Sequence, residues 1–335
     1  MTRIALNGLG RMGKLALRRL FDLGLGGHIV LINEPAGTPE QLALLMEFDS
    51  AQGRWQSVGH GPGALILGGR EIALTQGRRI EDLPLAAMGV DLVIDCTGVF
   101  KTPEKIAPYF AAGVARVVVS APVKGEGVAN LVYGVNHTIY DPDRHPIVTA
   151  ASCTTNCLAP MVKVVLESFG IRHASFTTIH DVTNTQTIID RPAKDMRRAR
   201  SALMNLIPTT TGSASAITQI FPELTGRIAG HAVRVPLVNA SLTDATFELA
   251  RETTVAEANA ALKAAAEGPL AGILGYETRP LVSCDYLGDA RSGVIDAGAT
   301  LVTAGTQLKL YAWYDNEWGY ACRLVDVARL VGGLA

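Results

Sequence analysis

Residues 3–13 read R-I-A-L-N-G-L-G-R-M-G, and this stretch decides the fold of the N-terminal half. Its first four residues predict a short buried strand, and a helical run follows over 14–23. Gly8, Gly10 and Gly13 have the G-x-G-x-x-G spacing of a dinucleotide-binding loop. The first glycine permits a tight turn, the second lets the backbone approach a pyrophosphate, and the third lets the helix pack on the strand. The phosphates would then face the helix N-terminus.

The next strand, His28–Ile32, ends in Asn33-Glu34. Glu34 lies about 20 residues past Gly13, where a carboxylate binds the adenosine ribose. A carboxylate accepts from the 2′-hydroxyl and repels a 2′-phosphate, so this position favours NAD over NADP. The competing interpretation, a surface loop with incidental glycines, does not account for Glu34.

Further alternation of strands and helices predicts a doubly wound parallel sheet, with strands at 90–95, 114–120 and 146–150 and a helix near 103–112. Its strand ends fall at Asn7, Glu34, Asp95 and Ser120. The loops Thr97-Gly98 and Ser120-Ala121 lie where a dinucleotide would cross such a sheet, although ordinary turn chemistry also explains them.

The pattern changes after residue 170. Strands are expected at 175–180, 231–237 and 241–251, with a hairpin around 304–306, and they alternate as antiparallel strands do. A helix is expected over 255–267, with Thr254 and Glu257 in capping-box spacing, and another over 317–330. We therefore expect an α/β chain: a Rossmann domain over 1–152, completed by 317–335, and an α+β catalytic domain over 153–316 with a large, mostly antiparallel sheet.

Residues 151–157 read A-S-C-T-T-N-C, between the strand at 146–150 and an amphipathic run at 158–169. Cys153 therefore sits where a strand turns into a helix, and a helix N-terminus favours a thiolate over a thiol. The alternative is a buried structural cysteine. The polar neighbours of Cys153 and a histidine at the end of a later strand favour a nucleophile.

Composition excludes several classes of protein. The chain has 335 residues, is 48% hydrophobic and carries a net charge of −1, so we expect no nucleic-acid or membrane partner. The N-terminus enters a strand directly, without a signal-peptide pattern. Five cysteines without metal-ligand spacing indicate no disulfide framework and no metal, and hence a cytoplasmic protein.

Three motifs together resemble the glyceraldehyde-3-phosphate dehydrogenase family: G-L-G-R-M-G at 8–13, A-S-C-T-T-N-C at 151–157 and W-Y-D-N-E-W-G-Y at 313–320. The resemblance extends over essentially the whole chain. It implies that Cys153 attacks the aldehyde of glyceraldehyde 3-phosphate and that His180 takes the hydroxyl proton as hydride leaves for NAD. The thioester would then be attacked by an inorganic oxyanion, phosphate or arsenate.

The resemblance also assigns binding residues. Those matching the substrate-phosphate position are Arg234, Thr183 and Arg198, and those matching the inorganic-anion position are Ser152, Thr154, Thr211 and Gly212. The cofactor-binding set is Asn7, Gly8, Gly10, Arg11, Met12, Glu34, Arg78, Thr97, Gly98, Ser120 and Asn316. Within it, Arg11 matches a pyrophosphate-side residue, Arg78 an adenine-side one and Asn316 the ligand of the nicotinamide carboxamide. The loop at 181–200 looks like the segment that lies across a subunit interface, which implies a homotetramer.

Several positions depart from the common family pattern: Thr185 stands at a usual Asp, Ser215 at a usual Lys and Arg191 at a usual Leu. Arg191 could soften discrimination against NADP. The segments H-D-V-T-N-T-Q, T-G-S-A-S-A-I and M-E-F-D-S-A-Q-G-R-W resemble the subgroup encoded beside arsenic-resistance genes. That subgroup is understood to form 1-arseno-3-phosphoglycerate for export by a permease.

Two alternatives remain open. Erythrose-4-phosphate dehydrogenase shares the I-N-E strand ending and the C-T-G-V loop at 96–99, but it usually lacks the T-T-T-G loop that stands here at 209–212. A non-catalytic nucleotide-sensing protein would keep the fold without turnover, and it would have no need for Cys153, His180, Asn316 and Arg234 together.

Overall fold

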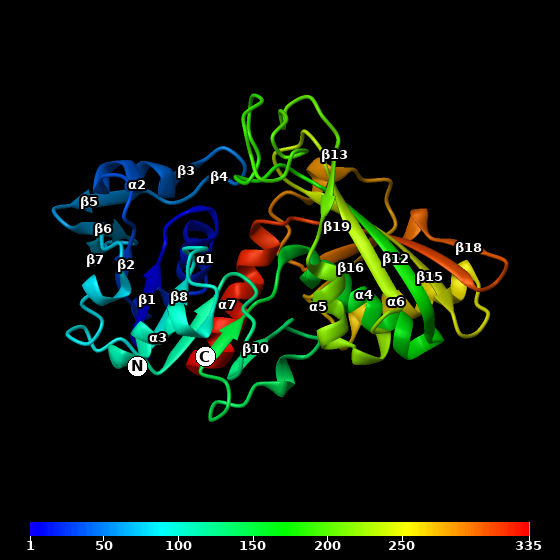
Figure 1. Cartoon of the computed structure of the whole chain (residues 1–335), viewed down its shortest axis with the longest axis horizontal. Coiled ribbons are helices and arrows are strands. Elements are labelled where there is room, and N and C mark those ends of the chain that lie inside the picture. Colours follow the sequence, from blue (N-terminus) through cyan, green and yellow to red (C-terminus); the bar gives the residue numbers. More distant parts are fainter. Residues whose placement is uncertain (335) are drawn as a thin grey trace. The chain divides into compact units, whose positions relative to one another are not determined.

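The computed structural model describes residues 1–334. The chain divides into two compact units, Met1–Ser152 with Ala321–Ala335, and Cys153–Tyr320 (Figure 1). Ala335, the last residue of the segment expected to complete the first domain, lies outside the described residues. Among the described helices, none combines the length and apolar character needed to cross a bilayer.

The first unit is built on one large sheet with the strand order β10-β11-β9-β8-β1-β2-β7-β6-β5. Neighbours from β10 to β7 pair in parallel, which confirms the doubly wound sheet, and β6 and β5 add an antiparallel edge that the sequence pattern did not indicate. The strands are β1 (Ile4–Asn7), β2 (Ile29–Asn33), β5 (Val58–Gly61), β6 (Ala64–Leu67), β7 (Arg70–Thr75), β8 (Leu92–Asp95), β9 (Arg116–Val119), β10 (Val128–Asn130) and β11 (Ile147–Thr149). A separate short pair is β3 (Phe48–Asp49) with β4 (Gly53–Arg54), and the helices are α1 (Arg11–Asp22), α2 (Pro39–Glu47) and α3 (Pro103–Ala111).

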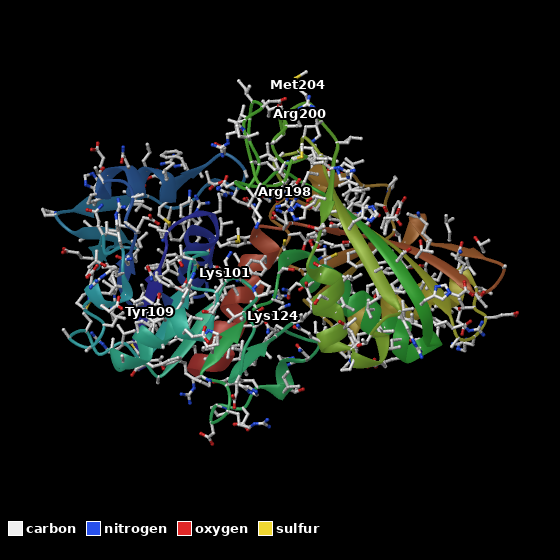
Figure 2. The ribbon with its side chains drawn as sticks, in the orientation of Figure 1. Lys101, Tyr109, Lys124, Arg198, Arg200 and Met204 are labelled. Atoms are coloured by element: carbon white, nitrogen blue, oxygen red, sulfur yellow. The ribbon has the colours of Figure 1, made fainter. Side chains whose placement is uncertain are left out.

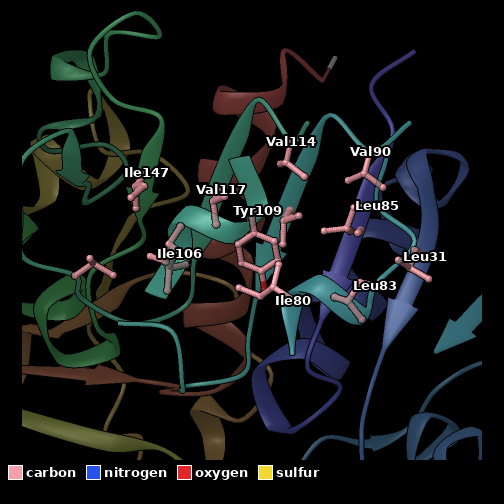
Figure 3. Packing of buried hydrophobic residues seen from close by; sticks show 14 residues of the cluster. Leu31, Ile80, Leu83, Leu85, Val90, Ile106, Tyr109, Val114, Val117 and Ile147 are labelled. Atoms are coloured by element: carbon pink, nitrogen blue, oxygen red, sulfur yellow. The ribbon is translucent and has the colours of Figure 1, made fainter. Parts of the chain in front are cut away.

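One core of this unit forms where α3 meets the sheet. Ile106 and Tyr109 of α3 are fully buried against apolar side chains of the central strands, including Ala5, Val93 and Val117 (Figure 3). Strands buried on both faces read as continuous apolar runs, which is the pattern of a parallel sheet. This packing fixes the strand ends from which the glycine-rich loop and the loop after β8 emerge.

The second unit has a mixed sheet in the order β13-β14-β12-β15-β19-β17-β16, and β18 pairs with β19. Residues of β15 alternate between buried and half-buried, so one face of the sheet packs on the helices. Its strands are β12 (Ile171–His180), β13 (Ile207–Thr210), β14 (Ile228–Arg234), β15 (Ser241–Leu249), β16 (Leu274–Glu277), β17 (Gly293–Asp296), β18 (Leu301–Thr303) and β19 (Gln307–Tyr314). Its helices are α4 (Cys153–Phe169), α5 (Ser213–Ile220) and α6 (Val255–Glu267), while α7 (Trp318–Gly332) contains the boundary between the units.

One expectation about this sheet is wrong. The strands near 175–180 and 231–237 were expected to be antiparallel, but β12 and β14 pair in parallel, with His180 opposite Arg234. Strand alternation reveals which residues share a face and not the direction of the strand. The long connection through β13 and α5 provides the crossover that a parallel pair requires.

Candidate active site

Cys153 is the first residue of α4, which begins five residues before the apolar periodicity that predicted it. The turn from β11 into this helix passes through Ala151, whose φ of 53° lies in the left-handed region that non-glycine residues rarely adopt. Such strain is maintained by the surrounding structure and is typical of functional sites. The N–H groups of the first helical turn and the helix dipole stabilise negative charge at this sulfur.

His180 is the last residue of β12, and its Nε2 lies 3.6 Å from Cys153 Sγ. Burial by itself lowers the pKa of His180, but hydrogen bonds to Asp181 and Cys153 outweigh burial and raise the pKa to about 9. Burial raises the pKa of Cys153, but the hydrogen bond to His180, together with the charges of His180 and Arg234, outweighs burial and lowers the pKa of the thiol. The pair therefore favours thiolate and imidazolium at neutral pH.

Behind His180 lies a buried polar network that the sequence analysis missed. Asp181 Oδ1 lies 2.6 Å from His180 Nδ1, and Asp181 Oδ2 accepts a hydrogen bond from Asn316 Nδ2 at 2.8 Å. Ser241 Oγ donates to Asn316 Oδ1 at 2.9 Å. A signal was present in the sequence, because a carboxylate follows the candidate base directly at the end of a strand.

Tyr314 was also missed, although it stands in one of the diagnostic motifs. Its hydroxyl oxygen lies 2.7 Å from Thr178 Oγ1 and 3.0 Å from Thr154 Oγ1, and its ring meets the His180 ring edge-on at 6.1 Å between centroids. Tyr314 is buried and joins β12 and the first turn of α4 from within β19. It fixes the rotamers around the Cys153–His180 pair.

Arg234 lies beside His180 because parallel strands β12 and β14 end at the same edge of the sheet. Its Nη1 is 2.5 Å from His180 Nδ1 and donates to the Asp181 carbonyl oxygen at 3.1 Å. Its buried Nε has no hydrogen-bond partner among residues 1–334. Burial lowers the pKa of Arg234, and the charge of Arg198 lowers it further. Arg234 therefore offers an unsatisfied cationic donor next to the Cys153–His180 pair.

The remaining predicted anion ligands lie at the N-termini of α4 and α5 and on the loop between β12 and β13. Ser152 directly precedes α4, Thr154 lies in its first turn, and Thr211 and Gly212 directly precede α5. Gly212 is the N-cap of α5 without a side-chain cap, and Thr211 Oγ1 accepts from Ser213 N at 3.2 Å. Thr155 Oγ1 donates to Ser213 Oγ at 3.3 Å, so the N-termini of α4 and α5 are neighbours. The two sets of helix N–H groups thus form a site with the character that tetrahedral anions prefer.

Arg198 lies on the loop between β12 and β13 (Figure 2), and Thr183 lies on the same loop. Thr183 Oγ1 lies 2.8 Å from Thr185 Oγ1, and Arg198 Nε donates to Thr209 Oγ1 at 3.0 Å. Arg198 also lies 3.4 Å from Asp195 Oδ2. The charge of Arg198 lowers the pKa of Arg234, whereas Thr183 carries no charge.

The glycine-rich loop of the first unit fits a dinucleotide. Gly8 has a φ of 92°, and a Cβ there would lie 2.8 Å from the Cys96 carbonyl carbon. A Cβ on Gly13 would lie 1.9 Å from the Gly8 carbonyl oxygen, so the helix approaches the strand only because residue 13 has no side chain. Gly10 is the N-cap of α1, makes no side-chain cap and faces open space. A pyrophosphate can therefore reach the first N–H groups of α1.

Glu34 follows β2 and is half-buried. Its Oε2 accepts from Leu9 N at 2.7 Å and its Oε1 accepts from Ala36 N at 3.0 Å. A carboxylate has about four lone-pair sites, so both oxygens can still accept a ribose hydroxyl. Glu34 thus also ties the glycine-rich loop to the end of β2.

Other expected cofactor residues are engaged by the protein itself. Asn7 is buried, with Oδ1 accepting from Asn33 and Nδ2 donating to Tyr109, so its side chain supports the strand ends. Arg11 forms an ion pair with the buried Asp49. The positions of the others are mixed: Thr97 donates to Asp95 from the loop after β8, Met12 and Ser120 are half-buried, and Gly98 and Arg78 are exposed.

The two units each match a known family model. Residues 2–103 match the NAD-binding domain of glyceraldehyde 3-phosphate dehydrogenase, and residues 152–316 match its C-terminal domain. Glyceraldehyde-3-phosphate dehydrogenase 3 of Nostoc sp. is 54% identical over 98% of both chains. The chain belongs to the glyceraldehyde-3-phosphate dehydrogenase family.

Two further relatives are less similar to the chain than the Nostoc protein is. Glyceraldehyde-3-phosphate dehydrogenase of Geobacillus stearothermophilus is 45% identical over 98% of both chains, and the Saccharomyces cerevisiae enzyme 1 is 42% identical over 99% of both. The protein is therefore an NAD-dependent oxidoreductase that oxidises glyceraldehyde 3-phosphate.

Proposed function

We propose that Cys153 is the nucleophile and His180 the acid–base group of this oxidation, with residues 1–152 and the C-terminal helix holding NAD and residues 153–316 performing the chemistry. The observation that carries this proposal is the 3.6 Å contact between Cys153 Sγ and His180 Nε2 at the start of α4. A thiolate is the reactive form of cysteine, and an adjacent imidazolium keeps it ionised.

The proposed oxidation takes place at Cys153 Sγ and the His180 imidazole. Cys153 Sγ forms a bond to the aldehyde carbon, and His180 Nε2 gives its proton to the aldehyde oxygen, which yields a thiohemiacetal. His180 then takes the hydroxyl proton back while the carbon loses hydride, and the product is a thioester. Bound NAD supplies the hydride acceptor, held by the residues of the glycine-rich loop together with Glu34 and Asn316. The backbone N–H of Cys153 is placed to stabilise the oxyanion.

The thioester is resolved by an inorganic oxyanion that adds to the carbonyl carbon, after which the C–S bond breaks and Cys153 leaves as thiolate. Ser152, Thr154, Thr211 and Gly212 are the proposed ligands of this anion. Thr154 Oγ1 is occupied by Tyr314 at 3.0 Å, so Thr154 would contribute its backbone N–H. Arg234, with its unsatisfied buried Nε, is the proposed main ligand of the substrate phosphate, and Thr183 and Arg198 assist it.

We propose arsenate as the physiological anion. The support is the resemblance of 180–186, 211–217 and 46–55 to the arsenic-associated subgroup. The departure at Thr185 concerns the substrate phosphate and not the inorganic anion, because Thr185 Oγ1 lies 2.8 Å from Thr183 Oγ1. An Asp at 185 would bind the Thr183 hydroxyl proton on its carboxylate and add negative charge beside that phosphate.

Arsenate and phosphate share tetrahedral shape and charge, so the N–H and hydroxyl ligands accept both, and the role must be decided by kinetics. The test measures NADH formation with purified protein, glyceraldehyde 3-phosphate and NAD while phosphate or arsenate is varied over physiological concentrations. We expect kcat/KM for arsenate to equal or exceed that for phosphate. A strong preference for phosphate would refute the arsenate role and leave the dehydrogenase assignment intact.

The arsenate product is labile, so it would serve detoxification only if it is removed from the cytoplasm, and we propose a functional link to an organoarsenical efflux permease. Transport of arsenic out of cells that carry both genes, compared with either alone, tests this link. Equal export with and without the permease would argue against it.

Erythrose 4-phosphate is the competing substrate. Its oxidation in that enzyme class ends in hydrolysis and does not require an anion loop, whereas Thr209–Gly212 and the α5 N-terminus are intact here. Assays with both sugar phosphates, with and without added anion, separate the two. Anion-independent oxidation of erythrose 4-phosphate at the higher kcat/KM would favour the alternative. A sensor without turnover is excluded if iodoacetamide labels a single fast-reacting cysteine and NADH is formed.

We also propose a homotetramer. The loop between β12 and β13 exposes large apolar side chains, with Met204 85% and Ile189 77% exposed (Figure 2 labels Met204 on this loop). Ile188, Met196, Leu203 and Leu206 of the same loop are exposed too. Several large exposed apolar side chains on one loop are typical of an interaction site. Light scattering coupled to size-exclusion chromatography gives the mass directly, and a monomer at micromolar concentration would contradict the proposal.

A further inference from the structure

Asp181 is a buried carboxylate in direct contact with His180, and the reaction steps proposed for Cys153 and His180 assign it no part. It follows β12 immediately and is 1% exposed. Neighbouring residues of a strand point to opposite faces. Asp181 lies just beyond the last residue of β12, where the alternation of a strand no longer applies, so its contact with His180 depends on the local geometry of the strand end.

The donors around Asp181 Oδ1 show which group its carboxylate binds. Its Oδ1 has two neighbours, His180 Nδ1 at 2.6 Å and Ser241 Oγ at 3.4 Å. Ser241 has one hydroxyl proton, and the shorter bond takes it to Asn316 Oδ1 at 2.9 Å. An ionised carboxylate only accepts, so a proton on His180 Nδ1 is required to satisfy Oδ1.

The second oxygen of Asp181 fixes the orientation of Asn316. Asp181 Oδ2 accepts from Asn316 Nδ2 at 2.8 Å, and Ser241 Oγ donates to Asn316 Oδ1. A flipped amide would place two acceptors together at Asp181. One N–H of the Asn316 amide therefore remains for another acceptor. A single carboxylate thus sets the state of His180 and the direction of Asn316.

The groups facing His180 come from four elements. Cys153 of α4 faces Nε2, and Tyr314 of β19 packs against the ring. Facing Nδ1 are Arg234 of β14, the Asp181 carboxylate and, at 3.0 Å, the Asp181 carbonyl oxygen. Arg234 carries donors only, so its approach to Nδ1 opposes protonation there. The carboxylate and carbonyl oxygens of Asp181 both accept the Nδ1 proton and offset it, and the carboxylate adds the negative charge. Arg234 Nη1 has a separate acceptor in the Asp181 carbonyl oxygen at 3.1 Å. Asp181 can therefore accept from Arg234 through its carbonyl oxygen and from the His180 imidazolium through its carboxylate.

We propose that Asp181 is a positioning residue whose carboxylate stabilises the imidazolium form of His180, in which the Nδ1 proton is directed to Asp181 and the Nε2 proton to Cys153 Sγ. The inference builds on the proposed roles of Cys153 and His180. It predicts that a neutral residue at 181 makes the imidazolium lose its proton at lower pH. One pH unit corresponds to a tenfold change in proton affinity.

The experiment replaces Asp181→Asn in the full-length enzyme and measures the single-turnover burst of NADH from pH 6 to 10 with saturating NAD. We expect the alkaline limb of the burst rate to move down by at least one pH unit. We also expect the burst rate at pH 8 to fall about tenfold or more, while KM for glyceraldehyde 3-phosphate changes less than about threefold. A merely structural role would not shift the limb.

The matched control is Glu257→Gln, the same carboxylate-to-amide change on α6, where Glu257 pairs with Arg251 Nη2 at 2.9 Å. We expect its pH profile to coincide with that of the unmodified enzyme. If the pH profile of Asp181→Asn also coincides with that of the unmodified enzyme, within about 0.3 pH unit, the inference is overturned.

A measurement on the unmodified protein covers the case in which Asp181→Asn does not fold. Histidine-selective ¹⁵N NMR, assigned with His180→Asn, is expected to show Nδ1 of His180 protonated at pH 7.5. An unprotonated Nδ1 overturns the inference. Failure of the proposed function is seen separately, as a burst that survives Cys153→Ala.

Discussion

Replacing Tyr109→Phe removes one hydroxyl from the core of the NAD-binding unit, and we expect a large loss of stability from it. Tyr109 is fully buried within the apolar cluster around α3 (Figure 3). Its hydroxyl donates to Asp95 Oδ2 at 2.7 Å and accepts from Asn7 Nδ2 at 2.5 Å. Asp95 is also fully buried. The phenylalanine ring fits the same space, so the change isolates these two hydrogen bonds.

The magnitude follows from what each partner loses. A hydrogen bond to a charged group contributes about 1.5–3 kcal/mol, and a buried donor left without its acceptor costs about 1–3 kcal/mol. We take about 3 kcal/mol for the two together, because their effects overlap in one network. A domain of this size loses roughly 2–4 °C of Tm per kcal/mol, so Tm of the first unit should fall by about 6–12 °C.

The loss should depend on pH, and the sign is set by Asp95. Burial raises the pKa of Asp95, whereas its hydrogen bonds to Thr97 and Tyr109 lower it. A folded-state pKa above the unfolded value means that stability is present below pH 3.8 and is lost as pH rises through the folded pKa. Removing the Tyr109 hydroxyl raises the pKa of Asp95 further. The Tyr109→Phe deficit should therefore be larger at pH 8 than at pH 5.

Calorimetric scans at the two pH values test this prediction. Tyr140→Phe is the control, because its hydroxyl accepts only a long, partly buried hydrogen bond from Arg116 Nε at 3.3 Å. We expect less than about 1 kcal/mol from it. A Tyr109→Phe deficit no larger than that of the control, or one that grows toward acid pH, would refute the reasoning.

Three further predictions concern the cofactor loop, the thiol and an ion pair. Glu34→Ala removes the proposed ribose-binding carboxylate, so kcat/KM with NADP relative to NAD should rise about tenfold or more, measured by steady-state kinetics. His180→Asn removes the hydrogen bond that lowers the pKa of Cys153, so the midpoint of iodoacetamide labelling should move to higher pH. Burial opposes ionisation of Asp49, but the hydrogen bond and charge of Arg11, together with backbone hydrogen bonds from Gln52 and Ala51, outweigh burial and lower the pKa of Asp49 to about 2. Its contribution is present above pH 3.8 and lost as pH falls toward 2, so the difference in Tm between Asp49→Asn and the unmodified protein should shrink over that range.

Much of the first unit could be predicted because its signals are local. The glycine spacing, the carboxylate after β2 and the apolar runs each depend on a few adjacent residues, and the parallel sheet follows from their order. The expectation that Cys153 lies at a helix N-terminus is confirmed, although the apolar periodicity of α4 begins only at 158, where the helix packs. The first turn, 153–157, carries the polar and small residues of the site.

The parts of the site that the sequence analysis did not predict depend on contacts between residues far apart in the chain. Tyr314 reaches Thr154 across 160 positions, and Asn316 reaches Asp181 across 135. Neither pairing leaves a periodic pattern in the sequence. Asp181 was readable as a neighbour of His180, but alternation within a strand argues that the two side chains diverge. Only the end of β12 at His180 reverses that argument.

The parallel pairing of β12 and β14 positions His180 and Arg234 separately from the loop that carries Thr183, Thr185 and Arg198. Parallel strands end at one edge, so His180 and Arg234 are held side by side by the sheet register itself. Thr183 and Thr185 contact each other within that loop, and Arg198 donates to Thr209 of β13. Substitutions there can alter charge and donors around the substrate without moving the Cys153–His180 pair. We therefore expect Thr185→Asp to raise KM for the anionic substrates while the pH profile of Cys153 alkylation stays unchanged; a shifted alkylation profile would show that the loop and the sheet edge are coupled.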